Sequence, residues 1–383
     1  MVRAVRNGEA LRSVARRLGV SVSTVSHWVA HARGKPLARV SFASGKPGRA
    51  WNRTPASVEA RILRTRATLR KHSVLGEYGA DAIAAALGEG IERPAPVSRA
   101  TIYRVLERRG VLDAVHRQRR PAPPKGWYLP DLARGEAELD SFDFIEDLKI
   151  ANGPLVCVLT GISLHGALTE AKVMQARSAT ATVEALHARW QAWGLPTYAQ
   201  FDNDTVFQGP HQFTDTFGRV SRLCLALGVT PVFAPPREPG LQNAIEGFNA
   251  LWQSKVWQRH HCRHIAALER VSATYIAAHR NKTAHRRDSA HARRPFPERF
   301  TFDLHAALKG AIIFIRRSDE HGTVHLLGRT YPVAKNWPHR LVRCEVSLTD
   351  RRVRFYALRR REPDDQPLLH EIDYFHENKP SKG

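Results

Sequence analysis

The order of strand-like and helix-like runs between residues 138 and 280 restricts the fold more than any other feature of the sequence. Apolar residues first recur with strand periodicity in three runs, and helical and strand-like runs then alternate. The strand-like runs are 138–145, 155–162, 167–174, 197–201 and 230–234, and the helical runs are 179–193, 211–227, 241–261 and 265–280. This order predicts a mixed sheet covered by helices, and hence an α/β core.

Three acidic residues occupy informative places in this order. Asp140 lies in the first strand-like run, Asp202 follows a short strand-like run, and Glu246 lies in a helical run. Side chains alternate along a strand, so Asp143 is predicted to point away from Asp140. Carboxylates from two strands and one helix, brought together in space, form an all-oxygen site that suits Mg²⁺ or Mn²⁺. Taken singly, each acid could instead be solvated or paired with arginine.

The net charge of the 383-residue chain is strongly positive and unevenly distributed. There are 59 Lys and Arg residues against 36 Asp and Glu residues, which gives a formal charge of +23. Residues 1–136 contain 26 basic and 10 acidic side chains, so most of the excess lies there. This distribution predicts a polyanionic partner that contacts mainly the N-terminal third.

Residues 1–34 predict a helix-turn-helix DNA-binding unit. An amphipathic helix ends at Gly19, which allows a tight turn, and Ser21 or Ser23 can cap a second helix. In such a unit the second helix enters the major groove and nearby arginines contact phosphates. The predicted DNA contacts are Arg16, Arg17, Ser23, Thr24, Ser26, His27 and Arg33. A helical hairpin that does not bind DNA has the same periodicity, so both interpretations remain open.

Composition divides the rest of the chain into further segments. A second helix-turn-helix unit, with or without a wing, is predicted before the core, and alternating apolar and polar residues after it predict a small antiparallel β-barrel. The predicted segments are a linker at 35–56, the second helix-turn-helix unit at 57–113, a basic Pro-rich linker at 114–136, the core at 137–292, the barrel at 300–360 and an acidic tail at 361–383.

Several classes of protein are disfavoured by what the sequence lacks. The four cysteines lie far apart and form no C-x-x-C pair, so neither a disulfide framework nor a zinc ribbon is indicated. The longest apolar runs are well short of the roughly 20 residues that a membrane span needs. No signal peptide and no phosphate-binding Gly-Lys-Ser/Thr loop is present. A cytoplasmic protein without a membrane partner is therefore expected.

With these motifs the chain resembles the DDE transposase and retroviral integrase superfamily. The resemblance is carried by Leu-Asp140-Ser-Phe-Asp, by Phe-Asp202-Asn-Asp-Thr-Val-Phe, and by Gly240-Leu-Gln-Asn-Ala-Ile-Glu246-Gly-Phe-Asn249. The chain is similar in particular to bacterial insertion-sequence transposases, which carry helix-turn-helix domains before an RNase H-like catalytic core. It departs from the family pattern at Asp204, where Gly is usual, and in the 43 residues between Asp202 and Glu246, where many relatives have fewer.

The resemblance implies a function and a set of site residues. Asp140, Asp202 and Glu246 would be catalytic and hold two Mg²⁺ or Mn²⁺ ions. The substrates would be double-stranded DNA at the terminal repeats of a mobile element and target DNA, cleaved and joined by a homo-oligomer on DNA. Many relatives carry a basic residue four or seven positions after the catalytic Glu; here Gln253 is expected to contact the DNA end, with Asn249 nearby.

Two alternatives to a transposase remain open from the sequence. One is a DNA-binding regulator whose core has lost activity, which the unusual Asp204 favours. The other is an RNase H-like nuclease that cuts DNA without strand transfer.

Overall fold

The computed structural model describes residues 1–40, 54–88, 97–112, 123–151, 153–209, 214–235, 238 and 240–375. Parts of the predicted linkers (41–53 and 114–122), of the predicted second helix-turn-helix unit (89–96 and 113) and of the predicted tail (376–383) lie outside the described residues. The chain forms two compact units, one of Met1–Arg64 with Glu92–Val111 and one of Thr65–Ile91 with Leu112–Gly383. No helix in the described ranges is both long and apolar enough to cross a membrane.

The N-terminal helices form where the sequence predicts them. They are α1 (Val2–Arg6), α2 (Leu11–Leu18) and α3 (Val22–His31), followed by the short 3₁₀ helix η1 (Leu37–Arg39). Gly19 ends α2 in the left-handed conformation with φ of 64°. The Ser21 side chain accepts a hydrogen bond from the Thr24 backbone N–H and so caps α3. Val14, Ala15 and Val25 form a small buried core between these helices.

Three further helices occupy the region of the second predicted helix-turn-helix unit. They are α4 (Ala56–His72), α5 (Ala80–Gly88) and α6 (Arg99–Arg108), and the division between the two units passes within α4. The Ser98 hydroxyl accepts a hydrogen bond from the Thr101 backbone N–H at 3.2 Å and so caps α6. Buried Glu59 of α4 is ion-paired with Arg108 and Arg109, which ties α4 to the end of α6.

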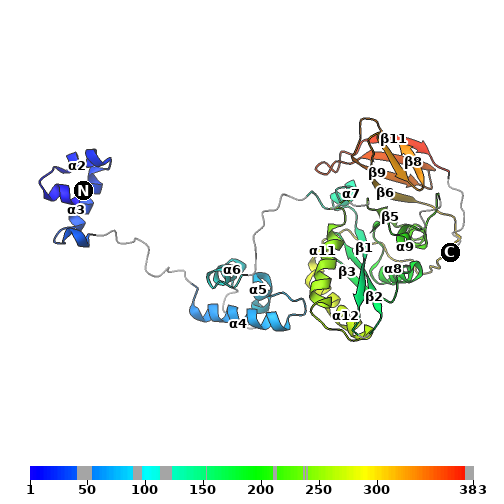
Figure 1. Ribbon diagram of the computed structural model, residues 1–383, viewed down its shortest axis with the longest axis horizontal. Helices are drawn as coiled ribbons and strands as arrows, with labels where there is room; N and C mark the ends of the chain where they lie inside the picture. Colours follow the sequence, from blue (N-terminus) through cyan, green and yellow to red (C-terminus); the bar gives the residue numbers. More distant parts are fainter. Residues whose placement is uncertain are drawn as a thin grey trace. The chain divides into compact units, whose positions relative to one another are not determined.

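The second unit is built on one sheet of nine strands (Figure 1). In spatial order these are β11 (Leu368–Asp373), β10 (Arg352–Ala357), β9 (Leu341–Ser347), β6 (Ala311–Arg317), β5 (Thr230–Phe233), β4 (Tyr198–Phe201), β1 (Leu139–Lys149), β2 (Leu155–Ser163) and β3 (Thr169–Met174). The three central pairs, β6 with β5, β5 with β4 and β4 with β1, are parallel, and the pairs on either side of them are antiparallel. The predicted mixed α/β sheet is confirmed.

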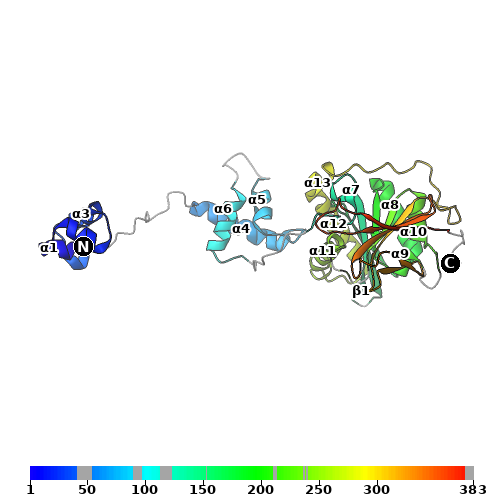
Figure 2. The same ribbon diagram turned by 90° about the horizontal axis from the view of Figure 1, so that it is seen from above.

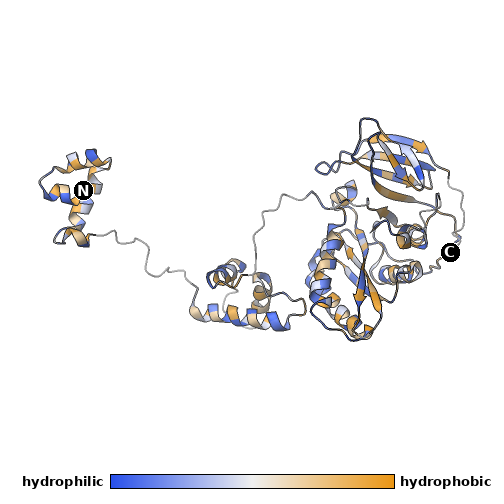
Figure 3. Cartoon of the chain, in the orientation of Figure 1, coloured by the Kyte–Doolittle hydropathy of each residue, from blue (hydrophilic) through white to orange (hydrophobic). Residues whose placement is uncertain are grey.

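Helices cover both faces of this sheet, as Figure 2 shows. One face is covered by α8 (Ala179–Trp193), α9 (Thr205–Gln208) and α10 (Arg219–Ala226), and the other by α11 (Asn243–Trp252) and α12 (Ile265–Lys282). The short helices α7 (Pro130–Ala133) and α13 (Ala284–Asp288) complete the unit. Hydrophobic residues lie in the strands and along the helices that cover them (Figure 3), because these surfaces are buried against one another.

The C-terminal strands differ from the prediction of a separate β-barrel at residues 300–360. Strand β6 pairs with β5, with Val232 beside Ile313, and so continues the sheet of the core. Phe314 stacks on Phe233 with ring centroids 5.0 Å apart, inside one hydrophobic cluster that also includes Phe355. Only the hairpin of β7 (Thr323–Leu326) and β8 (Arg329–Pro332) forms a sheet of its own among the described strands. The apolar run of β6 explains the difference, since it is buried on both faces against the core.

Candidate active site

Strand β1 directs Asp140 and Asp143 to opposite faces of the sheet. Phe142 belongs to the apolar cluster beneath α8 and α10, whereas Ile145 belongs to the cluster beneath α11 and α12. Alternation along the strand therefore puts Asp140 on the α8 face and Asp143 on the α11 face. Because Glu246 is carried by α11, Asp143 is the aspartate of β1 on the same side as Glu246.

Asp140 is fully buried in a cluster of ionic and hydrogen bonds, which corrects its prediction as a metal ligand. Arg189 and Arg293 each donate to both carboxylate oxygens, at 2.8 to 3.2 Å, and the Trp190 indole N–H donates at 3.1 Å. Burial alone would raise the pKa of Asp140, but the two guanidinium groups hold it well below its usual range. With five donors on two oxygens, the carboxylate has no side open to an ion, and it instead ties β1 to α8 and to residue 293.

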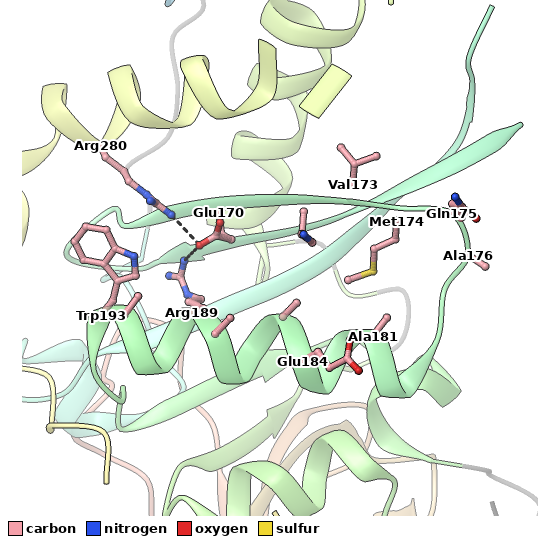
Figure 4. Close-up of a pocket in the computed structure, with 14 residues that line it drawn as sticks. Glu170, Val173, Met174, Gln175, Ala176, Ala181, Glu184, Arg189, Trp193 and Arg280 are labelled. Carbon is pink, nitrogen blue, oxygen red and sulfur yellow. Dashed lines mark hydrogen bonds and ion pairs between the residues drawn. The ribbon is translucent and has the colours of Figure 1, made fainter. Parts of the chain in front are cut away.

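The cluster around Asp140 continues toward the edge of the sheet. Arg189 also approaches Glu170 of β3 at 3.8 Å, and Glu170 pairs with Arg280 of α12 at 2.8 Å (Figure 4). Arg280 in turn lies over the ring of Trp193, 5.0 Å from its centroid. These contacts line a hollow of about 770 Å³ between β3 and α8. The α8 side of β1 is thus held by paired charges, which points to a structural role.

Asp143 lies level with Asp202 across parallel strands. Strands β1 and β4 pair with Ser141 beside Gln200, so two residues further along each strand brings Asp143 next to Asp202. The preceding residues confirm this register, since Phe142 stacks on Phe201 with ring centroids 5.6 Å apart. Both phenylalanines face α8, so the aspartate after each of them faces the other way.

Helix α11 adds Glu246 and Asn249 to this arrangement. Asn249 is buried, and its Nδ2 donates to Asp143 Oδ2 at 2.8 Å. The Thr160 hydroxyl of β2 donates to Asn249 Oδ1 at 2.6 Å and so fixes the orientation of the amide. The other Asp143 oxygen accepts the Phe144 backbone N–H at 2.8 Å. Asn249, predicted as a DNA contact, therefore holds Asp143 in place, with both ends of its amide bonded inside the protein.

Burial and neighbouring carboxylates raise the pKa of Asp143 and of Asp202. Burial raises the pKa of Asp143 to about 6, and the negative charges of Asp202, Glu246 and Glu146 contribute to the same shift. Burial also raises the pKa of Asp202, and the carboxylates of Asp204 and Glu146 act in the same direction. Carboxylates that repel one another in this way are stabilised by a cation among them.

Asp204 adopts a conformation that does not require glycine. Its φ is −61°, in the extended region, and its side chain caps α9 by accepting the Val206 N–H at 2.7 Å. Its own backbone N–H donates to Asp202 Oδ1 at 3.0 Å. The departure from the family pattern at this position therefore causes no backbone strain, and its carboxylate supplies the cap of α9.

The end of α11 differs from the long helix predicted for residues 241–261. From Gln253 to Trp257 the chain forms a π-helical turn, which changes the direction of the side chains after Trp252. Lys255 Nζ donates to the Gly76 carbonyl at 3.2 Å. Gln253 is half-buried, and no side-chain partner is found for it within the described part of the chain. Its contact with DNA stays a prediction.

The residues predicted to contact DNA in the first unit lie on its surface. Thr24 is half-buried, and the remaining six are exposed: Arg16, Arg17, Ser23, Ser26, His27 and Arg33. Arg17 pairs with Glu9 at 2.7 Å, and Ser23 shares a hydrogen bond with Ser21 at 2.8 Å. The arrangement leaves the outer side of α3 open, but DNA binding by these residues stays a prediction.

The group of Asp143, Asp202 and Glu246 fits a divalent cation in chemistry and charge. All donors are carboxylate oxygens, the ligands that Mg²⁺ and Mn²⁺ prefer. Over the described ranges, no three acidic, His or Cys side chains come close enough to hold one ion as they stand. Glu246 is exposed, and within those ranges no side-chain bond holds it away from the two aspartates.

One signal in the sequence favours Asp143 over Asp140 as the neighbour of Asp202. The dipeptide Phe-Asp occurs at 142–143 in the first strand and again at 201–202 after the fourth strand. Matching these two dipeptides aligns the strands as the structure does. By contrast, the sequence gives no sign that Asn249 and Thr160 orient Asp143.

No protein-family model matches the chain, and no curated protein matches it by sequence. Viral integrase structures are similar to parts of it. The BIV integrase catalytic core is 17% identical over 37% of this chain and 81% of its own, with a TM-score of 0.29. A chain of the simian T-cell lymphotropic virus intasome, solved with PP2A regulatory subunit B56 gamma, is 11% identical over 77% and 96%, with a TM-score of 0.35. The HTLV-2 integrase catalytic core, in complex with magnesium, is 10% identical over 41% and 87%, with a TM-score of 0.28.

Proposed function

We propose that this chain is a divalent-metal-dependent polynucleotidyl transferase of the transposase type, with Asp143, Asp202 and Glu246 as its metal ligands. The observation that carries the proposal is the register of β1 against β4, which sets Asp143 beside Asp202 on the face covered by α11. The hydrogen bond from Asn249 to Asp143 supports it, because it joins the helix of Glu246 to the strand of Asp143.

The chemistry follows from these carboxylates and their supports. Bound divalent ions would supply Lewis-acid activation of the attacking oxygen and charge stabilisation at the leaving 3′-oxygen. Asn249 orients Asp143, and the Asp204 N–H orients Asp202, so both ligands are held before ions arrive. No side chain need act as nucleophile, since the attacking oxygen belongs to water or to a DNA 3′-hydroxyl.

DNA recognition is assigned to the N-terminal helices. Residues 1–136 contain most of the excess positive charge, and α3 carries exposed Ser23, Ser26 and His27. We expect a protein lacking residues 1–113 to lose sequence-specific binding and to keep weak, salt-sensitive binding, because Lys and Arg contacts to phosphates release counterions. A footprint of that protein on the terminal repeat would place recognition elsewhere.

The two alternative functions are a regulator without activity and a nuclease without strand transfer. Asp204, where the family has Gly, favoured a regulator that has lost activity. It no longer does so, because any residue can adopt the φ of Asp204. The nuclease shares the proposed metal ligands, so only the reaction products distinguish it from a transposase.

The test begins with a search for inverted repeats in the DNA on both sides of the gene. A labelled oligonucleotide with such a repeat is then incubated with plasmid and Mg²⁺ or Mn²⁺. A transposase joins the label to plasmid, a nuclease only cuts, and a regulator does neither. Asp143→Asn, Asp202→Asn and Glu246→Gln should each lower joining by at least about a hundredfold without loss of repeat binding. Asp147→Asn, an exposed acid on the same strand, is the matched control and should join normally. Joining by Asp202→Asn at the wild-type rate, or in EDTA, would overturn the proposal.

A further inference from the structure

Arg177 forms a bridge between the two strands that carry the aspartates of the proposed site. It lies between the end of β3 and Ser178, the N-cap of α8. Its Nη1 contacts Glu146 Oε1 at 2.7 Å and also Asp204 Oδ2. Glu146 follows Asp143 by three residues and Asp204 follows Asp202 by two. A single nitrogen therefore links the chain segments of both aspartates.

The bridge acts on Asp202 through Asp204. The Asp204 side chain is held by Arg177 and by the Val206 N–H, while its backbone N–H donates to Asp202 Oδ1. Asp204 is only 18% exposed, whereas Arg177 is 39% exposed. The guanidinium thus fixes a partly buried residue that in turn orients a proposed metal ligand.

Arg177 also supplies positive charge to the acidic residues of the proposed site. Five acids gather here: Asp143, Glu146, Asp202, Asp204 and Glu246. Across the described ranges, the ion pairs that reach these five acids all come from Arg177. A fixed cation beside carboxylates repels a divalent ion while it keeps the carboxylates in place.

We propose that Arg177 is a positioning residue of this site, which orients Asp202 through Asp204 at the expense of divalent-ion affinity. This inference rests on the proposed function. It explains Asp204 as the residue that receives the arginine, a role that glycine could not fill. Removing the guanidinium should therefore strengthen ion binding and slow the reaction, two effects that loss of folding would not produce together.

The test compares Arg177→Gln, Arg177→Lys and Arg219→Gln with the wild type. Mn²⁺ binding without DNA is measured by electron paramagnetic resonance, and joining is measured as kcat and as KM for the DNA end. Arg177→Gln should bind Mn²⁺ about threefold more tightly and lower kcat about tenfold, with KM unchanged. Arg177→Lys should restore most of kcat, because one ammonium can contact both acids as Nη1 does. Arg219, whose described side-chain bond goes to Thr180, is the control and should match the wild type.

The outcomes separate this proposal from the proposed function. Mn²⁺ binding by the wild type that is lost in Asp202→Asn supports the metal site. If Arg177→Gln then binds Mn²⁺ with unchanged or lower affinity, or joins at the wild-type rate, the role of Arg177 is overturned while the metal site stands. If the wild type binds no Mn²⁺, both proposals are overturned.

Discussion

Asp140 and Asp143 lie three residues apart on one strand, yet their surroundings have opposite electrostatics. On the α8 face, Asp140 meets two guanidinium groups and an indole, and its pKa is lowered. On the α11 face, Asp143 meets an amide and other carboxylates, and its pKa is raised to about 6. A charge that is satisfied inside the protein stabilises the fold, whereas a charge that is not satisfied leaves room for a ligand. The α8 face of β1 therefore stabilises the fold, and the α11 face carries the proposed metal site.

The largest expected change in the free energy of unfolding comes from removing the charge of Asp140 on the α8 face. Asp140→Asn removes the carboxylate that pairs with both Arg189 and Arg293 and leaves buried Arg189 with only the more distant Glu170, which should cost about 3–5 kcal/mol of unfolding free energy. Urea denaturation of the purified variant measures this loss. Asp147→Asn, which is exposed, should unfold like the wild type. An Asp140→Asn midpoint equal to that of the wild type would show that the buried cluster does not stabilise the fold.

On the α11 face, the charge of Asp143 is expected to lower the free energy of unfolding, by less than the charge of Asp140 raises it. An unfolded Asp ionises near pH 4, whereas folded Asp143 ionises near pH 6. Between these values the folded state binds more protons, so Asp143 lowers stability as the pH rises from about 4 to 6, by up to about 3 kcal/mol. Without metal, the difference in stability between Asp143→Asn and the wild type should grow over this range and then remain constant. Parallel stability curves from pH 4 to 8, measured by urea denaturation in EDTA, would contradict the raised pKa.

The smallest effects should come from the neighbours of Glu246 on α11. Asn249→Ala frees Asp143 and should slow joining about tenfold, because misplaced catalytic groups lose rate steeply. Gln253→Ala removes only a predicted DNA contact and should slow joining about threefold, and Gln253→Lys should be tolerated. Single-turnover joining assays measure both. If Gln253→Ala slowed joining more than Asn249→Ala does, the predicted DNA contact of Gln253 would matter more for the reaction than the hydrogen bond that orients Asp143.

Local patterns predicted local structure well. Gly19 ends one helix and Ser21 begins the next, because each supplies a conformation or a hydrogen bond that neighbouring residues need. The run of strands and helices was enough to predict the mixed sheet, and Asp202 and Glu246 follow the strand and occupy the helix expected of them.

The errors share a physical cause, since they depend on partners that are distant in sequence. Which face of β1 is the site depends on pairing with β4, about fifty residues later, and alternation alone cannot choose between Asp140 and Asp143. Likewise, strand β6 was assigned to a barrel because its periodicity does not reveal that it pairs with β5. The bond between Asn249 and Asp143 depends on the packing of α11 over β1 and β2, which neither segment encodes by itself.

The pairing of β6 with β5 has a consequence for how the protein can be divided. Cutting the chain near residue 300 would expose the open edge of β5 together with Phe233 and Leu223, which pack in the same cluster as β6. An unpaired apolar strand edge recruits other strands, so such a fragment should self-associate. Amide hydrogen exchange should likewise find β4, β5, β6 and β9 protected to the same extent, as one cooperative unit. The C-terminal third therefore cannot be exchanged between proteins as an independent module.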